Sequence, residues 1–153
     1  MRLFYFISVL FVFISSCSNH HMSEIHAFRL KPGKDLRKEI EQYALEHQIQ
    51  AGWINCAVGS LTDYNIRFAN QPSGSKGSGH FEIVSLIGTV STNGSHLHIS
   101  ISDSTGKTIG GHLLDSCIIY TTAEVVIQES KEHVFTREKD GSTPWEELRI
   151  KKR

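Results

Sequence analysis

Three histidines form the group of residues in this sequence whose types and spacing best support chemistry. His96 and His98 stand two residues apart in a segment that reads His-Leu-His-Ile-Ser-Ile-Ser. Side chains of a β-strand point alternately to its two faces. We therefore expect the leucine and the isoleucines of this segment to face a core, and both histidines to share the opposite face with the serines.

The turn that follows decides where a third histidine lies. Residues 103–107 read Asp-Ser-Thr-Gly-Lys, which suits a three-residue hairpin loop with Gly106 in the left-handed bulge position. This register pairs Asp103 with Lys107, Ser100 with Gly110, and His98 with His112. Cβ atoms of directly opposite residues lie about 4.5–5.5 Å apart, a spacing that two ligands of one metal can use. A two-residue loop would instead turn His112 to the other face.

Three neutral imidazoles around one cation leave a fourth position open, a ligand set typical of catalytic zinc though not exclusive to it. His96, His98 and His112 are therefore candidate zinc ligands. The same spacing also fits a polar patch of half-exposed histidines on a sheet face or at a subunit interface. The spacing alone leaves both interpretations open.

Other polar residues carry weaker signals. An enzyme would need a general acid or base beside the metal, for which Glu82 and Glu124 are the candidates, with a structural position on the sheet as the alternative. We expect Asp103 to form the turn rather than to bind metal. Structural or surface roles are expected for the histidines without a readable partner, which are His26, His47 and His133.

The rest of the chain supplies the elements that must position these residues. Asp35 suits a helix N-cap, and apolar residues at three- and four-residue spacings predict a helix that ends near His47. Gly59-Ser60 is predicted as a turn, and residues 70–79 as a loop. Residues 143–151 fit either a helix or a closing strand. Strands are predicted at residues 25–30, 51–58, 61–69, 81–92, 96–103, 108–114, 117–128 and 133–139.

One helix followed by many short-linked strands predicts an α+β domain with a mostly antiparallel sheet. The 153 residues suffice for one hydrophobic core. Sixteen Lys and Arg balance sixteen Asp and Glu, so the clustered basic charge that nucleic-acid binding requires is not evident. Cys56 and Cys117 lie in apolar strand-like contexts and are expected to be buried free thiols.

The first residues indicate export. Arg2 precedes an apolar run over residues 3–14, and the sequence Ile14-Ser15-Ser16-Cys17 resembles a lipobox, in which the cysteine becomes lipidated. We expect a lipoprotein signal peptide at residues 1–16, lipidation at Cys17 and a tether at residues 17–23, which holds His20 and His21. The domain then covers residues 24–150 and a basic tail residues 151–153. Translation from Met22 is the alternative.

Several segments resemble the PPC (plants and prokaryotes conserved) family, in the expected order from about residue 24 to 150. They include Gly79-His80-Phe81-Glu82-Ile83-Val84, which is similar to the Gly-Arg-Phe-Glu-Ile-Leu signature of the family. The His-Leu-His segment and Gly110-Gly111-His112 resemble metal-binding prokaryotic members. The resemblance implies a twisted antiparallel sheet with flanking helices, assembled as a homotrimer.

Plant members of the family carry AT-hook segments that bind DNA. This sequence contains no Arg-Gly-Arg-Pro hook, and His80 stands where the plant signature has arginine. A nucleic-acid partner is therefore not expected.

The hypothesis favoured by the sequence is a homotrimeric zinc-binding module, exported and lipid-anchored in the bacterial cell envelope. One alternative is a zinc-dependent hydrolase or lyase, in which the open position activates water. Another is a cytoplasmic, DNA-associated regulator that starts at Met22. A small-molecule ligand is compatible with the first two, and the sequence does not assign catalytic residues.

Overall fold

A computed structural model describes residues 23–153. Its elements are β1 (Ser23–Leu30), α1 (Leu36–Glu46), β2 (Ala51–Arg67), β3 (Ser75–Ser91), β4 (Gly94–Ser102), β5 (Thr108–Leu113), β6 (Ile118–Ser130), β7 (His133–Glu138) and β8 (Glu147–Lys152). The signal peptide at residues 1–16, lipidation of Cys17 and nearly all of the tether lie outside the described residues. Ser23, which was assigned to the tether, is the first residue of β1.

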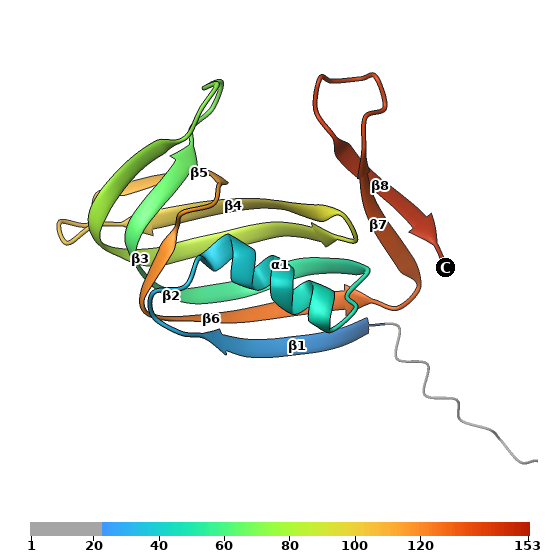
Figure 1. Cartoon of the computed structure of the whole chain (residues 1–153), viewed down its shortest axis with the longest axis horizontal. Helices are drawn as coiled ribbons and strands as arrows, with labels where there is room; N and C mark the ends of the chain where they lie inside the picture. The colour runs from blue at the N-terminus through green and yellow to red at the C-terminus, as the bar shows by residue number, and fades with distance from the viewer. Residues whose placement is uncertain (1–22) are drawn as a thin grey trace, which may run out of the picture.

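The strands form one six-stranded antiparallel sheet in the order β1-β6-β2-β3-β4-β5, and β7 pairs with β8 in a separate hairpin. The far edge strand β5 also pairs with the end of β2, through Ile66 with Leu113 and Arg67 with His112. The sheet therefore curls so that β5 approaches β2, as Figure 1 shows at the left. The mostly antiparallel fold with a single helix among the described residues confirms the prediction.

Helix α1 lies across one face of this sheet (Figure 1). The Asp35 carboxylate caps the helix by accepting a hydrogen bond of 3.3 Å from the backbone N–H of Lys38, as predicted. Leu36, Ile40 and Ala44 point from the helix into the core. That helix is too short and too polar to cross a membrane, and the described residues contain no other helix.

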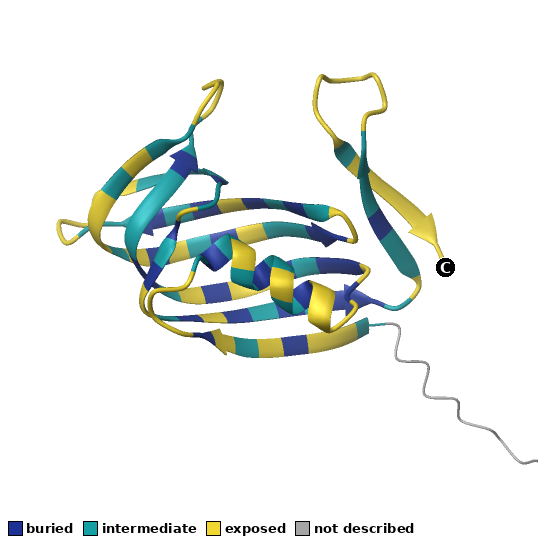
Figure 2. Cartoon of the chain, viewed as in Figure 1, coloured by how far each residue is buried: buried dark blue, intermediate teal, exposed yellow. Residues whose placement is uncertain are grey.

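The core lies between α1 and the inner face of the sheet. On β4 the buried residues Leu97, Ile99 and Ile101 belong to this core, whereas His96 and His98 alternate with them and are more exposed. Figure 2 shows the same alternation of buried and exposed residues along the strands. The histidines therefore lie on the face of the sheet that points away from α1, as the strand period predicted.

Strand β2 corrects one prediction. Gly59-Ser60 is not a turn, because β2 continues through it for 17 residues. The strand instead contains β-bulges, and the pairing with β6 shifts between Ile54 and Cys56 and again after Gly59. Gly59 has φ +151, and a Cβ there would lie 2.2 Å from the carbonyl oxygen of Thr122. Glycine at this position thus permits a close strand contact rather than a chain reversal.

The bulge after Ile54 corrects the prediction that both cysteines are buried. Cys117 is buried, but Cys56 is exposed. Because the bulge after Ile54 interrupts the alternation, Asn55 and Cys56 are both exposed before Ala57 returns to the core.

Two boundaries also differ from the predicted ones. The predicted loop at residues 70–79 is shorter, because β3 already begins at Ser75. The ambiguous C-terminal segment is a strand, and β8 includes Lys151 and Lys152 of the predicted basic tail. Arg153 is held by its guanidinium 3.3 Å from Glu129 and by its backbone N–H, which donates to Glu132.

The β7–β8 hairpin stands beside the open end of the sheet (Figure 1). Its backbone is attached at Phe135, which accepts a hydrogen bond of 3.0 Å from the N–H of Thr92 and donates one of 2.8 Å to the carbonyl of Gln50. The Phe135 side chain is buried. These contacts place the hairpin next to the turn between β3 and β4, close to the histidine-bearing strand.

Candidate metal centre

The hairpin between β4 and β5 has the register predicted from its turn residues. His98 pairs with His112, and Ser100 pairs with Gly110. The backbone N–H of Asp103 donates to Lys107 at 3.0 Å, and Gly106 has φ +82. The Asp103 carboxylate accepts hydrogen bonds from the backbone of Thr105 and Lys107. Asp103 is therefore a turn-forming residue, as expected.

This register brings His96, His98 and His112 together. Each offers one ring nitrogen, and the three nitrogens lie within 4.8 Å of one another. The Nε2 atoms of His96 and His98 are 3.2 Å apart. Two nitrogens bound to one tetrahedral zinc ion at about 2.0–2.1 Å would lie about 3.3–3.4 Å apart. The spacing of this pair therefore fits a shared metal ion with little rearrangement.

The protonation of the cluster also suits a metal site. Burial, and then the positive charge of Arg137, lower the pKa of His96. Burial, followed by the neighbouring His96 and Arg67, lowers the pKa of His112 to about 4. Both rings are therefore neutral at pH 7, which is the form that binds metal. The Nδ1 atom of His112 is buried without a hydrogen-bond partner, so one ring nitrogen of this residue is unsatisfied by the chain itself.

The surroundings of the cluster come from segments that sequence reasoning missed. One cavity of about 300 Å³ is lined by His96 and His98 together with Arg137, Glu147 and Leu148 of the β7–β8 hairpin. A second, of about 450 Å³, is lined by His96 and His112 and, among others, by Arg67, Arg137 and Trp145. No local pattern could have indicated these neighbours, because they depend on the docking of the hairpin and on the β2–β5 pairing.

The two carboxylates proposed as general acid or base lie elsewhere. Glu82 pairs with Ser102, four residues along β4 from His98, which corresponds to about 13 Å along the strand. Glu124 lies on β6, where it is opposite Arg29 on one side and Val58 on the other. Both side chains are exposed, which agrees with the alternative position on the sheet surface. The carboxylate that does line the histidine cavities on β8 is Glu147.

The three histidines for which structural or surface roles were expected contact structural partners. The Nε2 atom of buried His26 lies 3.2 Å from the Glu129 carboxylate. The ring of His47 stacks on Tyr43 with a centroid distance of 3.8 Å, and His133 hydrogen-bonds Ser130 at 2.8 Å. These contacts agree with the structural roles expected for the three residues. His20 and His21 lie outside the described residues.

A second group of possible metal ligands, Glu24, His26 and Glu129, has ligand atoms within 4.8 Å of one another. A cation already lies among them, because the Lys131 ammonium is 2.5 Å from Glu24 and 2.6 Å from Glu129. Arg153 approaches Glu129 from another side at 3.3 Å. This cluster is therefore neutralised by the chain's own side chains and is not a candidate metal site.

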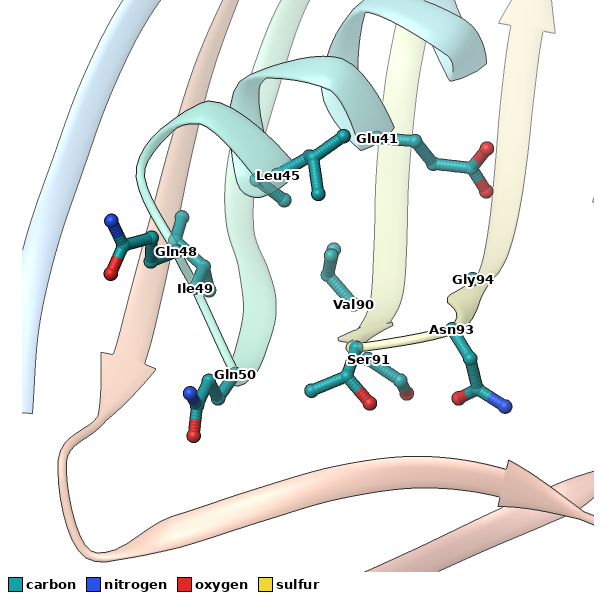
Figure 3. A pocket seen from close by; sticks show the side chains of 11 residues that line it. Glu41, Leu45, Gln48, Ile49, Gln50, Val90, Ser91, Asn93 and Gly94 are labelled. Atoms are coloured by element: carbon teal, nitrogen blue, oxygen red, sulfur yellow. The ribbon is translucent and has the colours of Figure 1, made fainter.

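A separate cavity of about 540 Å³ lies between the end of α1 and the β3–β4 turn. Figure 3 shows Gln48, Gln50 and Asn93 around apolar Leu45 and Ile49. Its one lining carboxylate, Glu41, is engaged by Arg37 at 3.1 Å and by the Ser95 hydroxyl at 2.6 Å. The residues that line the cavity include neither histidine nor cysteine, so we do not consider it a candidate metal or catalytic site.

A curled antiparallel sheet with a helix on one face and a three-histidine cluster on the other defines a small α+β domain with a candidate metal centre. The sequence matches the Plants and Prokaryotes Conserved (PCC) domain over residues 18–131. The chain belongs to this family, the one called PPC above. All three clustered histidines lie inside the matched stretch.

Two individual proteins are similar to most of this chain. The chain is 42% identical over 128 residues to the bifunctional protein GlmU of a Synechococcus strain, but it spans only 21% of the length of that protein. A hypothetical protein from Salmonella enterica has a similar structure, with a TM-score of 0.83 and 36% identity, covering 86% of this chain and 95% of its own.

One further structure is also similar. A metal-containing protein from Archaeoglobus fulgidus is 27% identical, with a TM-score of 0.70, covering 81% of this chain and 91% of its own.

Proposed function

We propose that the protein is a homotrimeric zinc-binding module that a lipid on Cys17 holds at the bacterial cell envelope. The observation that carries the metal-binding part is the grouping of three histidine nitrogens within 4.8 Å of one another. The neutral state of His96 and His112 supports it, as does the similarity to a metal-containing protein. Zinc is proposed because three imidazoles with an open position are a ligand set that suits it.

The proposed trimer is supported by the outer face of the sheet. Val58, Val84 and Ile87 on the adjacent strands β2 and β3 are 57%, 57% and 58% exposed. Tyr120 on β6 is also exposed. Large apolar side chains exposed on adjacent strands favour protein–protein contact. Ile87 pairs directly with His98, so assembly through this face would bring the metal site near a subunit boundary.

A binding role is favoured over hydrolase or lyase chemistry because the carboxylates proposed for catalysis, Glu82 and Glu124, do not line the histidine cavities. The Glu147 carboxylate is near the cluster but accepts a hydrogen bond of 2.5 Å from the Thr143 hydroxyl. That contact orients the carboxylate within its own hairpin.

The metal proposal is tested by elemental analysis after zinc loading and removal of excess metal. We expect about one zinc ion per subunit in the wild type and a large loss in the double variant His98→Ala/His112→Ala. The matched control is His80→Ala, which removes an exposed histidine that stacks near Tyr120 at 4.4 Å rather than in the cluster. Unchanged zinc content in the double variant would refute the site.

The envelope proposal rests on the sequence of residues 1–17 alone. It predicts that the chain expressed in a Gram-negative bacterium incorporates radiolabelled palmitate and fractionates with membranes. Cys17→Ser should abolish both, whereas Cys56→Ser, which changes an exposed thiol in β2, should leave both unchanged. An unlipidated chain that begins at Met22 would support the cytoplasmic alternative instead.

A further inference from the structure

Arg67 lies directly beside the histidine cluster. It pairs with His112 across the β2–β5 contact, and His112 pairs in turn with His98 across the β4–β5 contact. Residues opposite one another in a sheet project from the same face. Arg67, His112 and His98 therefore form a row across three strands, with the arginine at one end.

Arg137 approaches the same space from the β7–β8 hairpin. Its backbone is fixed to the β3–β4 turn, because the Asn93 side-chain amide donates to the Arg137 carbonyl at 2.9 Å and accepts from the Arg137 N–H at 2.8 Å. Its guanidinium donates to the backbone carbonyl of Glu146. Arg137 lines both histidine cavities, so the two arginines approach the cluster from different elements.

Neither guanidinium has a carboxylate within ion-pair distance in the part of the chain that the structure describes. Arg37 and Arg149, by contrast, each contact a carboxylate. Arg67 instead lies over the Trp145 ring, with its guanidinium carbon 5.5 Å from the ring centroid. Stacking of this kind holds the plane of the guanidinium while leaving its N–H donors available.

Glu146 and Glu147 line the larger cavity together with these arginines, so the cavity without metal is close to electrically balanced. A divalent cation at the histidines would give it a net positive charge. The cation would also keep one coordination position for a further ligand, because the described residues place no carboxylate or thiolate in the three-histidine group. The cavity volume of about 450 Å³ lies within the range of small-molecule sites.

We propose that this cavity binds a small oxyanion, a carboxylate or a phosphate, between the metal and the two arginines. One oxygen fills the open position on the metal, and the remaining oxygens accept hydrogen bonds from Arg67 and Arg137. Guanidinium groups match the planar geometry of both anions, and charge-assisted hydrogen bonds of this kind are among the strongest in proteins. The inference rests on the metal binding proposed above and adds the class of ligand.

Calorimetry on the full-length protein tests the inference, with zinc content measured first on every sample. Zinc-loaded wild type, freed of excess metal, is titrated separately with inorganic phosphate and with acetate. Arg67→Gln and Arg137→Gln should each keep about one zinc per subunit and weaken anion binding at least tenfold. The control Arg149→Gln, on the same hairpin but outside the cavity residues, should bind the anion as the wild type does. Zinc-free wild type should also bind at least tenfold more weakly.

The outcomes separate the two proposals. Two results obtained at normal zinc content would overturn the anion site and leave the metal site intact. One is that both arginine variants keep the anion affinity of the wild type. The other is that the wild type binds neither anion. Absence of zinc from the wild type overturns both. A stronger response to phosphate or to acetate assigns the ligand to phosphates or carboxylates. Arg67→Lys guards against misfolding, because it keeps the charge and should recover part of the affinity that Arg67→Gln loses.

Discussion

Two clusters in this protein combine imidazole with neighbouring charged groups, yet they have different physical states. The cluster of Glu24, His26 and Glu129 lies where β1 pairs with β6, and its carboxylates are engaged by Lys131 and Arg153. The cluster of His96, His98 and His112 lies on the outer face of the sheet and leaves the buried Nδ1 of His112 without a partner. The presence of metal-binding residue types is therefore not the criterion for a site. What differs is whether cationic side chains of the protein already contact the possible ligand groups, as Lys131 and Arg153 do in the first cluster.

The largest effect on stability is expected from the cluster of Glu24, His26 and Glu129. We call it the satisfied cluster, because its carboxylates already contact cationic side chains. Glu129 is 1% exposed and contacts His26, Lys131 and Arg153. Glu129→Ala should lower the free energy of unfolding by about 3 kcal/mol, because it removes the shared partner of buried His26 and of the partly exposed Lys131 and Arg153. Urea denaturation measures this loss. His98→Ala without metal is the comparison and should cost less than about 1 kcal/mol, since that ring is exposed. Equal losses would remove the distinction between the clusters.

Zinc should stabilise the folded protein only by binding to His96, His98 and His112, the unsatisfied cluster. At a free zinc concentration one hundred times Kd, the free energy of unfolding should rise by about 2.7 kcal/mol. Thermal denaturation with and without a chelator measures the rise. His98→Ala/His112→Ala should abolish it and His26→Ala should retain it, provided that the latter variant folds by circular dichroism. If only the His26 variant lost the effect, the two clusters would have been assigned the wrong way round.

Acidification should weaken the zinc-free protein through His112. Its pKa is about 4 in the folded chain and about 6.5 in an unfolded one. Between these values the unfolded chain binds more protons, so the free energy of unfolding decreases as the pH falls from about 6.5 towards 4. Because the ring is only half-buried and partly screened by water, we expect a loss of about 1–2 kcal/mol. His112→Gln, measured over the same pH range, should show a shallower dependence, and an unchanged slope would argue against this account.

The smallest effect is expected at the exposed edge of the satisfied cluster. Glu24 contacts Lys131 at 2.5 Å, and the pKa of Glu24 is lowered chiefly by its hydrogen bond to this lysine. Since the pair is open to solvent, Glu24→Gln should lower the melting temperature by about 2 °C or less. Differential scanning calorimetry would detect a larger change, which would mean that Glu24 supports Glu129 more strongly than its exposure indicates.

Local sequence patterns predicted those parts of the site that depend on neighbours in the chain. The alternation on β4 and the left-handed Gly106 fixed the pairing of His98 with His112, because both are properties of a single hairpin. The helix was predictable for the same reason, from its cap and its apolar spacing. These local rules were sufficient to predict the grouping of His96, His98 and His112.

The remainder depends on contacts between segments far apart in the sequence. A glycine that marks a turn and one that marks a bulge look alike, so the prediction of a turn at Gly59 was wrong. The exposure of Cys56 depends on a second bulge, after Ile54, that no local pattern marks. Arg67 reaches His112 only because β5 also pairs with β2. Arg137 and Trp145 reach the cluster only because Phe135 fixes their hairpin to the sheet. None of these pairings leaves a signal in local composition.

The attachment of the β7–β8 hairpin has a consequence for how such proteins diverge. The three histidines lie within the stretch of the chain that matches the family, residues 18–131, whereas Arg137, Trp145 and Glu147 come after it. The hairpin joins the body through few backbone contacts, and its tip at residues 139–146 belongs to neither strand. Substitutions or length changes there can alter which ligand the cavity prefers while the three histidines of the candidate metal site stay in place. The proposed metal site and the proposed anion selectivity can therefore evolve separately in one small domain.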